Sequence, residues 1–261
     1  MGQEASTESR GFGWFLSQQY EENAVIQNEG RSGYTSTDIR EDFTNIIKQS
    51  TSPNHPPVLL FTIFLGANDA FLPIPPVDDS DEGCVPLATF SANIRSFVDT
   101  FLSQKANAMA ETKILLITPP PANINRPFDI GVSRKDFEML NEEEKRGHSY
   151  KTFVSKKRYA EEIMRIAKEY GESGRVVGLD FWGDLIRTGF RVRREEYDEN
   201  RLPGCGLYGV DEFGEGYFTD GLHLDAKGYD VLSQGVYNKV VYTWPELAPE
   251  ALSVPQSRSA A

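Results

Sequence analysis

The chain has 261 residues and a formal net charge of −12, with 39 acidic residues against 27 Lys and Arg. This length suits one large domain or two small ones, with a substantial buried core. The acidic balance disfavours nucleic acid and anionic membranes as partners, because both require a basic face. No apolar run reaches the roughly 20 residues that span a bilayer.

Two further features concern the compartment. The two cysteines are too few for a disulfide framework or a thiolate zinc site. The first ten residues, MGQEASTESR, contain an early acid and lack the apolar segment of a signal peptide. We therefore expect a cytoplasmic protein.

The predicted elements alternate between strands and helices along the chain. Short apolar runs typical of buried strands lie at 24–28, 57–66, 113–121 and 175–182. Apolar residues recur at helical intervals in 87–101, 159–170 and 229–240. This alternation predicts an α/β fold, with right-handed crossovers and helices on both faces of a parallel sheet.

Three segments depart from this alternation. Residues 126–149 are charge-rich and weakly periodic, and residues 187–216 are long and loop-like. Segments of this kind are usually functional lids or disordered insertions, and the sequence leaves both readings open. Residues 245–261 are rich in Pro, Ser and Ala, which predicts a disordered tail after one domain at 1–244.

Glycines and polar residues follow the predicted strands and precede the last helix: Gly33, Asn68, Asp69, Asp220 and His223. Taken singly, each has an ordinary reading as a turn or cap residue. Ligands of α/β folds bind at the carboxyl edge of the sheet, where these segments are expected to meet. An aspartate three residues before a histidine can hold one imidazole nitrogen and leave the other free to take a proton.

Five stretches occur in the order typical of one enzyme family: RGFGWFLSQQY, NEGRSGYTS, TIFLGANDAFLP, ILLITPPP and YFTDGLHLDAKGYDVL. On these stretches, which span about residues 10 to 240, the chain resembles the SGNH or GDSL-type ester hydrolases. Within them it is similar to the isoamyl acetate-hydrolysing esterase-like group. The resemblance implies a three-layer, flavodoxin-like fold and a small-molecule ester as substrate, with no cofactor and no metal.

The resemblance also implies a role for four residues. His223 matches the general base and Asp220 the residue that orients it. Gly33, through its backbone N–H, and Asn68, through its side-chain amide, match donors of the oxyanion hole. We expect all four to converge on one small cavity, with Asp220 hydrogen-bonded to Nδ1 of His223.

The family's first block, an apolar strand ending in Gly-Asp-Ser, has no counterpart before Gly11. Ser6 and Ser9 lack the strand-to-turn scaffold that would hold a hydroxyl against His223. No nucleophile is identified, and we expect an esterase in a truncated or inactive form. Since the family's first strand is central in its sheet, we also expect the strands at 24–28 and 57–66 to flank a gap, an intruding segment from residues 1–10, or a direct but irregular new pairing.

Two other functions are compatible with parts of the sequence. One is a non-catalytic binding or interaction module on the same fold, in which the four matched residues hold a carboxylate or acyl group. The other is a metallophosphoesterase built on Asp69, Asp220 and His223. Two-metal sites require several clustered His and acidic ligands, and this chain has three scattered histidines.

Overall fold

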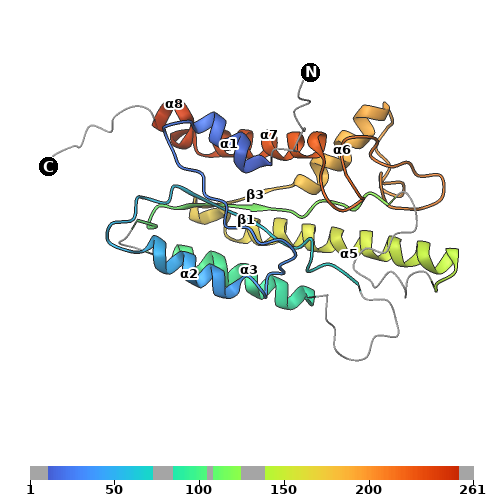
Figure 1. Cartoon of the computed structure of the whole chain (residues 1–261), viewed down its shortest axis with the longest axis horizontal. Coiled ribbons are helices and arrows are strands. Elements are labelled where there is room, and N and C mark those ends of the chain that lie inside the picture. Colours follow the sequence, from blue (N-terminus) through green and yellow to red (C-terminus); the bar gives the residue numbers. More distant parts are fainter. Residues whose placement is uncertain (1–10, 73–84, 105–107, 125–138, 253–261) are drawn as a thin grey trace, which may run out of the picture.

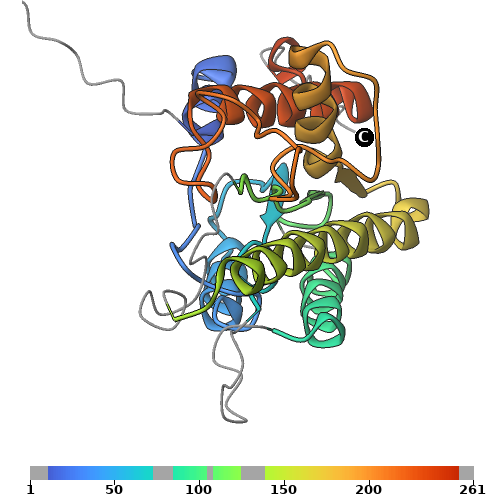
Figure 2. The same ribbon diagram turned by 90° about the vertical axis from the view of Figure 1, so that its right-hand side faces the viewer.

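The structure is a computed structural model that describes residues 11–72, 85–104, 108–124 and 139–252. A parallel sheet lies between two layers of helices (Figures 1 and 2). Its strands, in the order β1-β2-β3, are β1 (Leu60–Phe64), β2 (Lys113–Ile117) and β3 (Val176–Leu179). One layer contains α2 (Arg40–Ser50), α3 (Leu87–Leu102) and α5 (Glu142–Glu169). The other contains α1 (Phe12–Tyr20), α6 (Phe181–Arg193), α7 (Ala226–Thr243) and α8 (Pro249–Leu252). Two 3-10 turns, η1 (Gly171–Ser173) and η2 (Pro245–Leu247), complete the described elements. The α/β fold class is confirmed.

The middle strand, β2, explains why the predicted strands are apolar along their whole length. Alternate residues of a strand point to opposite faces of the sheet. Leu115 and Ile117 belong to the core under α1, α6 and α7. Ile114 and Leu116 belong to the core under α2 and α3. Both faces are covered, as is usual in parallel sheets, so neither face of β2 can be polar.

The three predicted helical segments are confirmed as α3, the second half of α5, and α7. The two irregular segments are partly helical, which corrects the loop-like reading of 187–216. Residues 142–149 begin α5, because Asn141 and Glu144 form a capping box. Residues 187–193 complete α6. Residues 125–138 lie outside the described part of the chain.

The strand expected at 24–28 is absent. Ala24 and Ile26 pack against the core while Val25 is 88% exposed, so the alternation of a strand is present. A strand also requires a hydrogen-bonded neighbour, and this segment has none among the described residues. On the side away from β2, β1 likewise has no strand partner in the described ranges. Among the described residues β1 is therefore an edge strand, and the expected strand at 24–28 does not lie beside it.

The tail expected to be disordered is ordered as far as Leu252. Residues 245–252 form η2 and α8, and the side chain of Leu247 is buried. The buried Tyr20 hydroxyl donates a hydrogen bond of 2.9 Å to the carbonyl of Leu247. Composition alone missed this segment because its order depends on a contact with α1, at the other end of the chain. Residues 253–261 lie outside the described part.

Replacing Tyr20 with Phe tests this contact. The substitution removes the hydroxyl and leaves the buried Leu247 carbonyl without its donor, so the free energy of unfolding should fall by about 1–3 kcal/mol. Urea unfolding measures the loss. Tyr242→Phe is the matched control, because Tyr242 is 90% exposed and its hydroxyl remains hydrated. Equal stability of the two variants would contradict the docking of η2 onto α1.

Candidate active site

Asp220 and His223 form a compact hydrogen-bonded unit just before α7. One carboxylate oxygen, Oδ1, accepts the backbone N–H groups of Leu222 at 3.0 Å and His223 at 2.8 Å. The other, Oδ2, lies 2.7 Å from Nδ1 of His223, as predicted. Between them Gly221 adopts φ +86°, and a Cβ there would lie 2.7 Å from the carbonyl oxygen of Asn123. The turn therefore requires glycine at 221.

The electrostatics of this pair favour an ionised carboxylate. Burial acts to raise the pKa of Asp220, but the hydrogen bonds from His223 and Leu222 outweigh it and hold the pKa below its ordinary value. When Nδ1 carries the proton shared with Asp220, Nε2 carries the lone pair. The His223 side chain is 70% exposed. Nε2 is therefore free to accept a proton from a group placed beside it.

The loop that carries this pair is attached to the sheet through the segment after β2. The backbone N–H of Asn123 donates to the carbonyl of Gly221 at 2.8 Å. The Asn123 side chain accepts the N–H of Phe213 at 3.0 Å. Asn68 follows β1, which pairs in parallel with β2. The segment after β2, which holds the loop of Asp220 and His223, and the turn that carries Asn68 therefore leave the sheet at the same edge.

The two expected oxyanion donors are brought together by a direct contact between their segments. The side-chain Nδ2 of Asn68 donates to the carbonyl of Tyr34 at 2.9 Å, beside Gly33. One hydrogen of this amide group remains for another acceptor. Gly33 adopts φ +78°, which favours glycine, and its N–H makes no hydrogen bond within the described residues. Both groups can donate to a ligand.

Asp69, considered above as a metal ligand, occupies a different environment. Its side chain is fully buried, and its two oxygens accept the backbone N–H groups of Ser36 at 2.9 Å and Gly66 at 3.2 Å. Burial raises its pKa, against the opposing effect of these hydrogen bonds. The Asp69 carboxylate is occupied by backbone N–H groups and is shielded from solvent, whereas the side chains of Asp220 and His223 are partly exposed. Within the described ranges, no three His, Cys, Asp or Glu side chains form a group that could hold a metal ion.

No hydroxyl group in the described part of the chain hydrogen-bonds to Nε2 of His223. Ser6 and Ser9 lie outside the described residues. The structure thus brings together the pair Asp220 and His223, and separately the pair Gly33 and Asn68. It leaves the nucleophile unassigned.

One unusual group near this edge was missed from the sequence. Lys156 of α5 is fully buried, and its Nζ donates to the carbonyl of Ala67 at 3.1 Å and lies 5.1 Å from the centre of the Phe71 ring. Burial lowers its pKa to about 7. A signal was present, because Lys156 is three residues after Phe153 and four before Ala160, both on the buried face of the helix.

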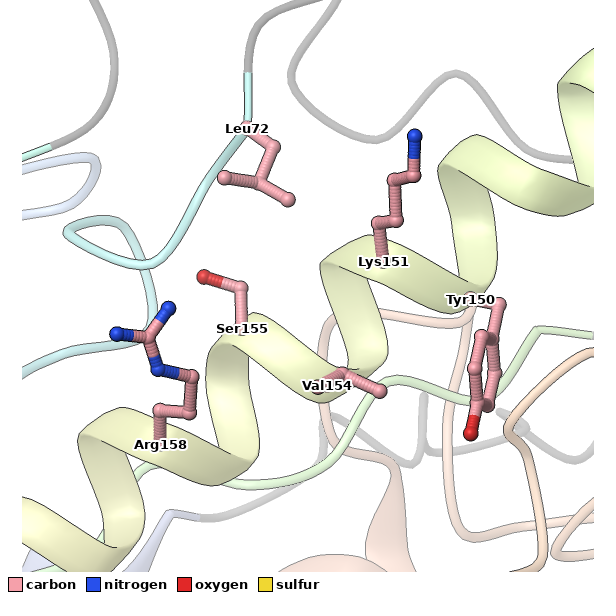
Figure 3. A pocket seen from close by; sticks show the side chains of 6 residues that line it. All are labelled: Leu72, Tyr150, Lys151, Val154, Ser155 and Arg158. Atoms are coloured by element: carbon pink, nitrogen blue, oxygen red, sulfur yellow. The ribbon is translucent and has the colours of Figure 1, made fainter.

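A cavity of about 300 Å³ lies between Leu72 and the outer side of α5 (Figure 3). Its lining combines apolar, hydroxyl and cationic side chains: Leu72, Val154, Tyr150, Ser155, Lys151 and Arg158. None of Gly33, Asn68, Asp220 and His223 lines it, so it is not the small cavity expected at these four residues.

Comparison with known proteins gives the family. The GDSL-like Lipase/Acylhydrolase family matches residues 2–236, which is most of the chain. The chain therefore belongs to this family of acyl ester hydrolases.

Two other comparisons add less. Among solved structures, the chain is similar to LAE5, described as an alpha/beta hydrolase enzyme from the metagenome of Lake Arreo, Spain. The identity is 14% and the TM-score 0.48, over 94% of this chain and 83% of the other. No curated protein matches the sequence. Among the described helices, none combines the length and the apolar character needed to cross a bilayer.

The buried amine of Lys156 predicts a specific pH dependence of stability. Its folded-state pKa, about 7, is below the ordinary 10.5, so the unfolded chain binds more protons between these values. Its contribution to the free energy of unfolding is therefore least favourable below pH 7 and improves as pH rises toward 10.5. Between pH 6 and 9.5 this improvement amounts to about 3 kcal/mol.

Lys156→Met should remove this dependence. We expect the variant to be more stable than the parent at pH 6, where it avoids burying a charge. Its advantage should shrink or reverse by pH 9.5, because the Ala67 carbonyl has lost its donor. Chemical denaturation at both pH values measures the difference. Lys157→Met is the control, since the Lys157 side chain is 41% exposed and lies 3.8 Å from Glu161. A pH-independent difference between Lys156→Met and the parent would contradict the buried amine.

Proposed function

We propose that this chain is an SGNH-type ester hydrolase with a serine mechanism, of the isoamyl acetate-hydrolysing esterase-like group, acting on a small-molecule ester. The observation that carries the proposal is the 2.7 Å contact between Asp220 Oδ2 and His223 Nδ1, with the rest of the imidazole exposed. In this proposal the two residues are the orienter and the general base. Family membership supplies the reaction class, and the pair supplies the chemistry it requires.

In this proposal each of the four matched residues has a separate role in the reaction. His223 Nε2 takes the proton of a serine hydroxyl as the serine oxygen attacks the ester carbonyl. The Gly33 N–H and the free hydrogen of the Asn68 amide donate to the oxygen that becomes negative. Asp220 stabilises the imidazolium formed at this stage. His223 then gives the proton to the leaving alcohol. Water next attacks the acyl-serine as His223 takes its proton, and His223 returns this proton to the serine oxygen as the carboxylic acid is released.

We propose that no serine of the described residues is the nucleophile. The support is the free Nε2 of His223 and the absence of a family-type Gly-Asp-Ser block in residues 11–252. We further propose one domain that extends through α8 to Leu252 instead of ending at 244, because η2 and α8 pack on α1 and α7.

A second candidate is a binding module that uses the same residues without catalysis. The observation in its favour is that no hydroxyl among the described residues hydrogen-bonds to Nε2 of His223. Gly33 and Asn68 would then hold a carboxylate or an acyl carbonyl. The two candidates differ in whether a correctly placed serine makes the site active.

Activity toward p-nitrophenyl butyrate separates the candidates. The chain as printed should hydrolyse it little or not at all, since a site lacking one triad member keeps only about 10³–10⁴-fold over water. A family-type strand ending in Gly-Asp-Ser, fused before Gly11, should produce an esterase. In the fusion, His223→Ala should abolish turnover. Asn68→Ala should lower kcat by about 10²–10³, as expected for the loss of one oxyanion donor.

The unmodified chain supplies the controls. Robust turnover that is lost on Ser6→Ala or Ser9→Ala would place the nucleophile within the first ten residues. Turnover that survives His223→Ala would contradict the site. A folded, monodisperse chain that stays inactive with and without the fused block would favour the binding module.

A further inference from the structure

Asp69 joins two segments that are distant in sequence and that each carry an oxyanion donor. Ser36, which donates its N–H to Oδ1, lies three residues after Gly33. Gly66, which donates to Oδ2, lies two residues before Asn68. The same carboxylate thus bridges the Gly33 loop and the Asn68 turn from a fully buried position.

Asn93 of α3 reinforces the same junction. Its side-chain Nδ2 donates to the hydroxyls of Ser36 at 3.0 Å and Thr37 at 3.1 Å. Ser36 is fully buried and Asn93 nearly so. The carbonyl of Asp69 in turn accepts the N–H of Val85, just before α3. The loop and the turn are therefore both hydrogen-bonded to the segment between Val85 and Asn93, which includes the first half of α3.

The Asn68 turn has little freedom to shift. Gly66 adopts φ +106°, and a Cβ at that position would lie 3.2 Å from the side chains of both Phe90 and Pro119. The turn is therefore packed between α3 and the segment after β2. Movement between the two donors must come from the loop that carries Gly33, which is exposed except where Ser36 is held.

We propose that Asp69 and Asn93 are positioning residues that fix the distance between the Gly33 N–H and the Asn68 amide. Oxyanion donors act only when both lie within hydrogen-bond reach of one oxygen, so displacements of about 0.5 Å are costly. The inference rests on the proposed function, because it assigns a purpose to a spacing that matters only if both groups bind one ligand.

Asp69→Asn is the informative substitution. Asn has nearly the same shape, but its Nδ2 donates hydrogen bonds and cannot accept one. In either orientation of the amide, the N–H of Ser36 or of Gly66 loses its acceptor. The volume of the core is preserved while one of the two tethers is removed.

Butyrate is the probe, because it is the carboxylate product of a short-chain ester and offers two oxygens to the donors. Its binding to the printed chain can be followed by the NMR shifts of the Gly33 N–H and the Asn68 side-chain amide. We expect saturable shifts at both groups in the parent. Asp69→Asn should raise the butyrate Kd by at least about tenfold, and Asn93→Ala should raise it less.

Asp99→Asn is the matched control, since Asp99 accepts the Tyr170 hydroxyl at 2.8 Å on the surface of α3. It should leave the Kd unchanged. If Asp69→Asn lowers thermal stability but binds butyrate as the parent does, the role is only structural and the inference fails. If Asp69→Asn does not fold, Asn93→Ala is tested instead: a raised butyrate Kd supports the inference, and an unchanged Kd overturns it. Absence of a response in the parent would overturn the proposed oxyanion site, and this inference with it.

Discussion

The parallel alignment of β1, β2 and β3 is the constraint on which the site depends, because it sends the following segments to one edge. Both faces of β2 are apolar, so polarity does not distinguish one register from another slipped by a residue. Polar contacts at the strand ends distinguish the observed register from a slipped one. The Thr112 hydroxyl donates to the carbonyl of Val58 before β1 and β2. After β2, the Thr118 N–H donates to Leu179, and the Thr118 hydroxyl accepts the N–H of Trp182.

The two halves of the candidate site are held by different kinds of contact. Asp220 and His223 are organised by hydrogen bonds that span no more than three residues. The oxyanion donors depend on contacts between residues more than thirty positions apart, through Asn68 and Asp69. The contact between Asp220 and His223 can therefore form wherever their loop is anchored. The juxtaposition of Gly33 and Asn68 instead requires the whole fold.

This difference also explains what the sequence could predict. Local patterns predicted the strands β1 to β3, the helical stripes and the contact between Asp220 and His223. They failed where order depends on a distant partner. Residues 24–28 have the alternation of a strand without a neighbour to pair with, and η2 is ordered by Tyr20, more than two hundred positions away. The pairing of Asp69 with Ser36 has no local signal at all.

The turn after β1 shows why buried charge is retained beside the site. The backbone between Gly66 and Phe71 has left the sheet, so its N–H and carbonyl groups need partners from elsewhere. Asp69 accepts the N–H of Gly66, and Lys156 donates to the carbonyl of Ala67. Apolar side chains would fill the same volume and avoid the desolvation of both charges, but each would leave a buried backbone group unpaired. This irregular turn presents the Asn68 amide at the edge of the sheet. It can occupy a buried position because the polar side chains of Asp69 and Lys156 pair with its backbone groups.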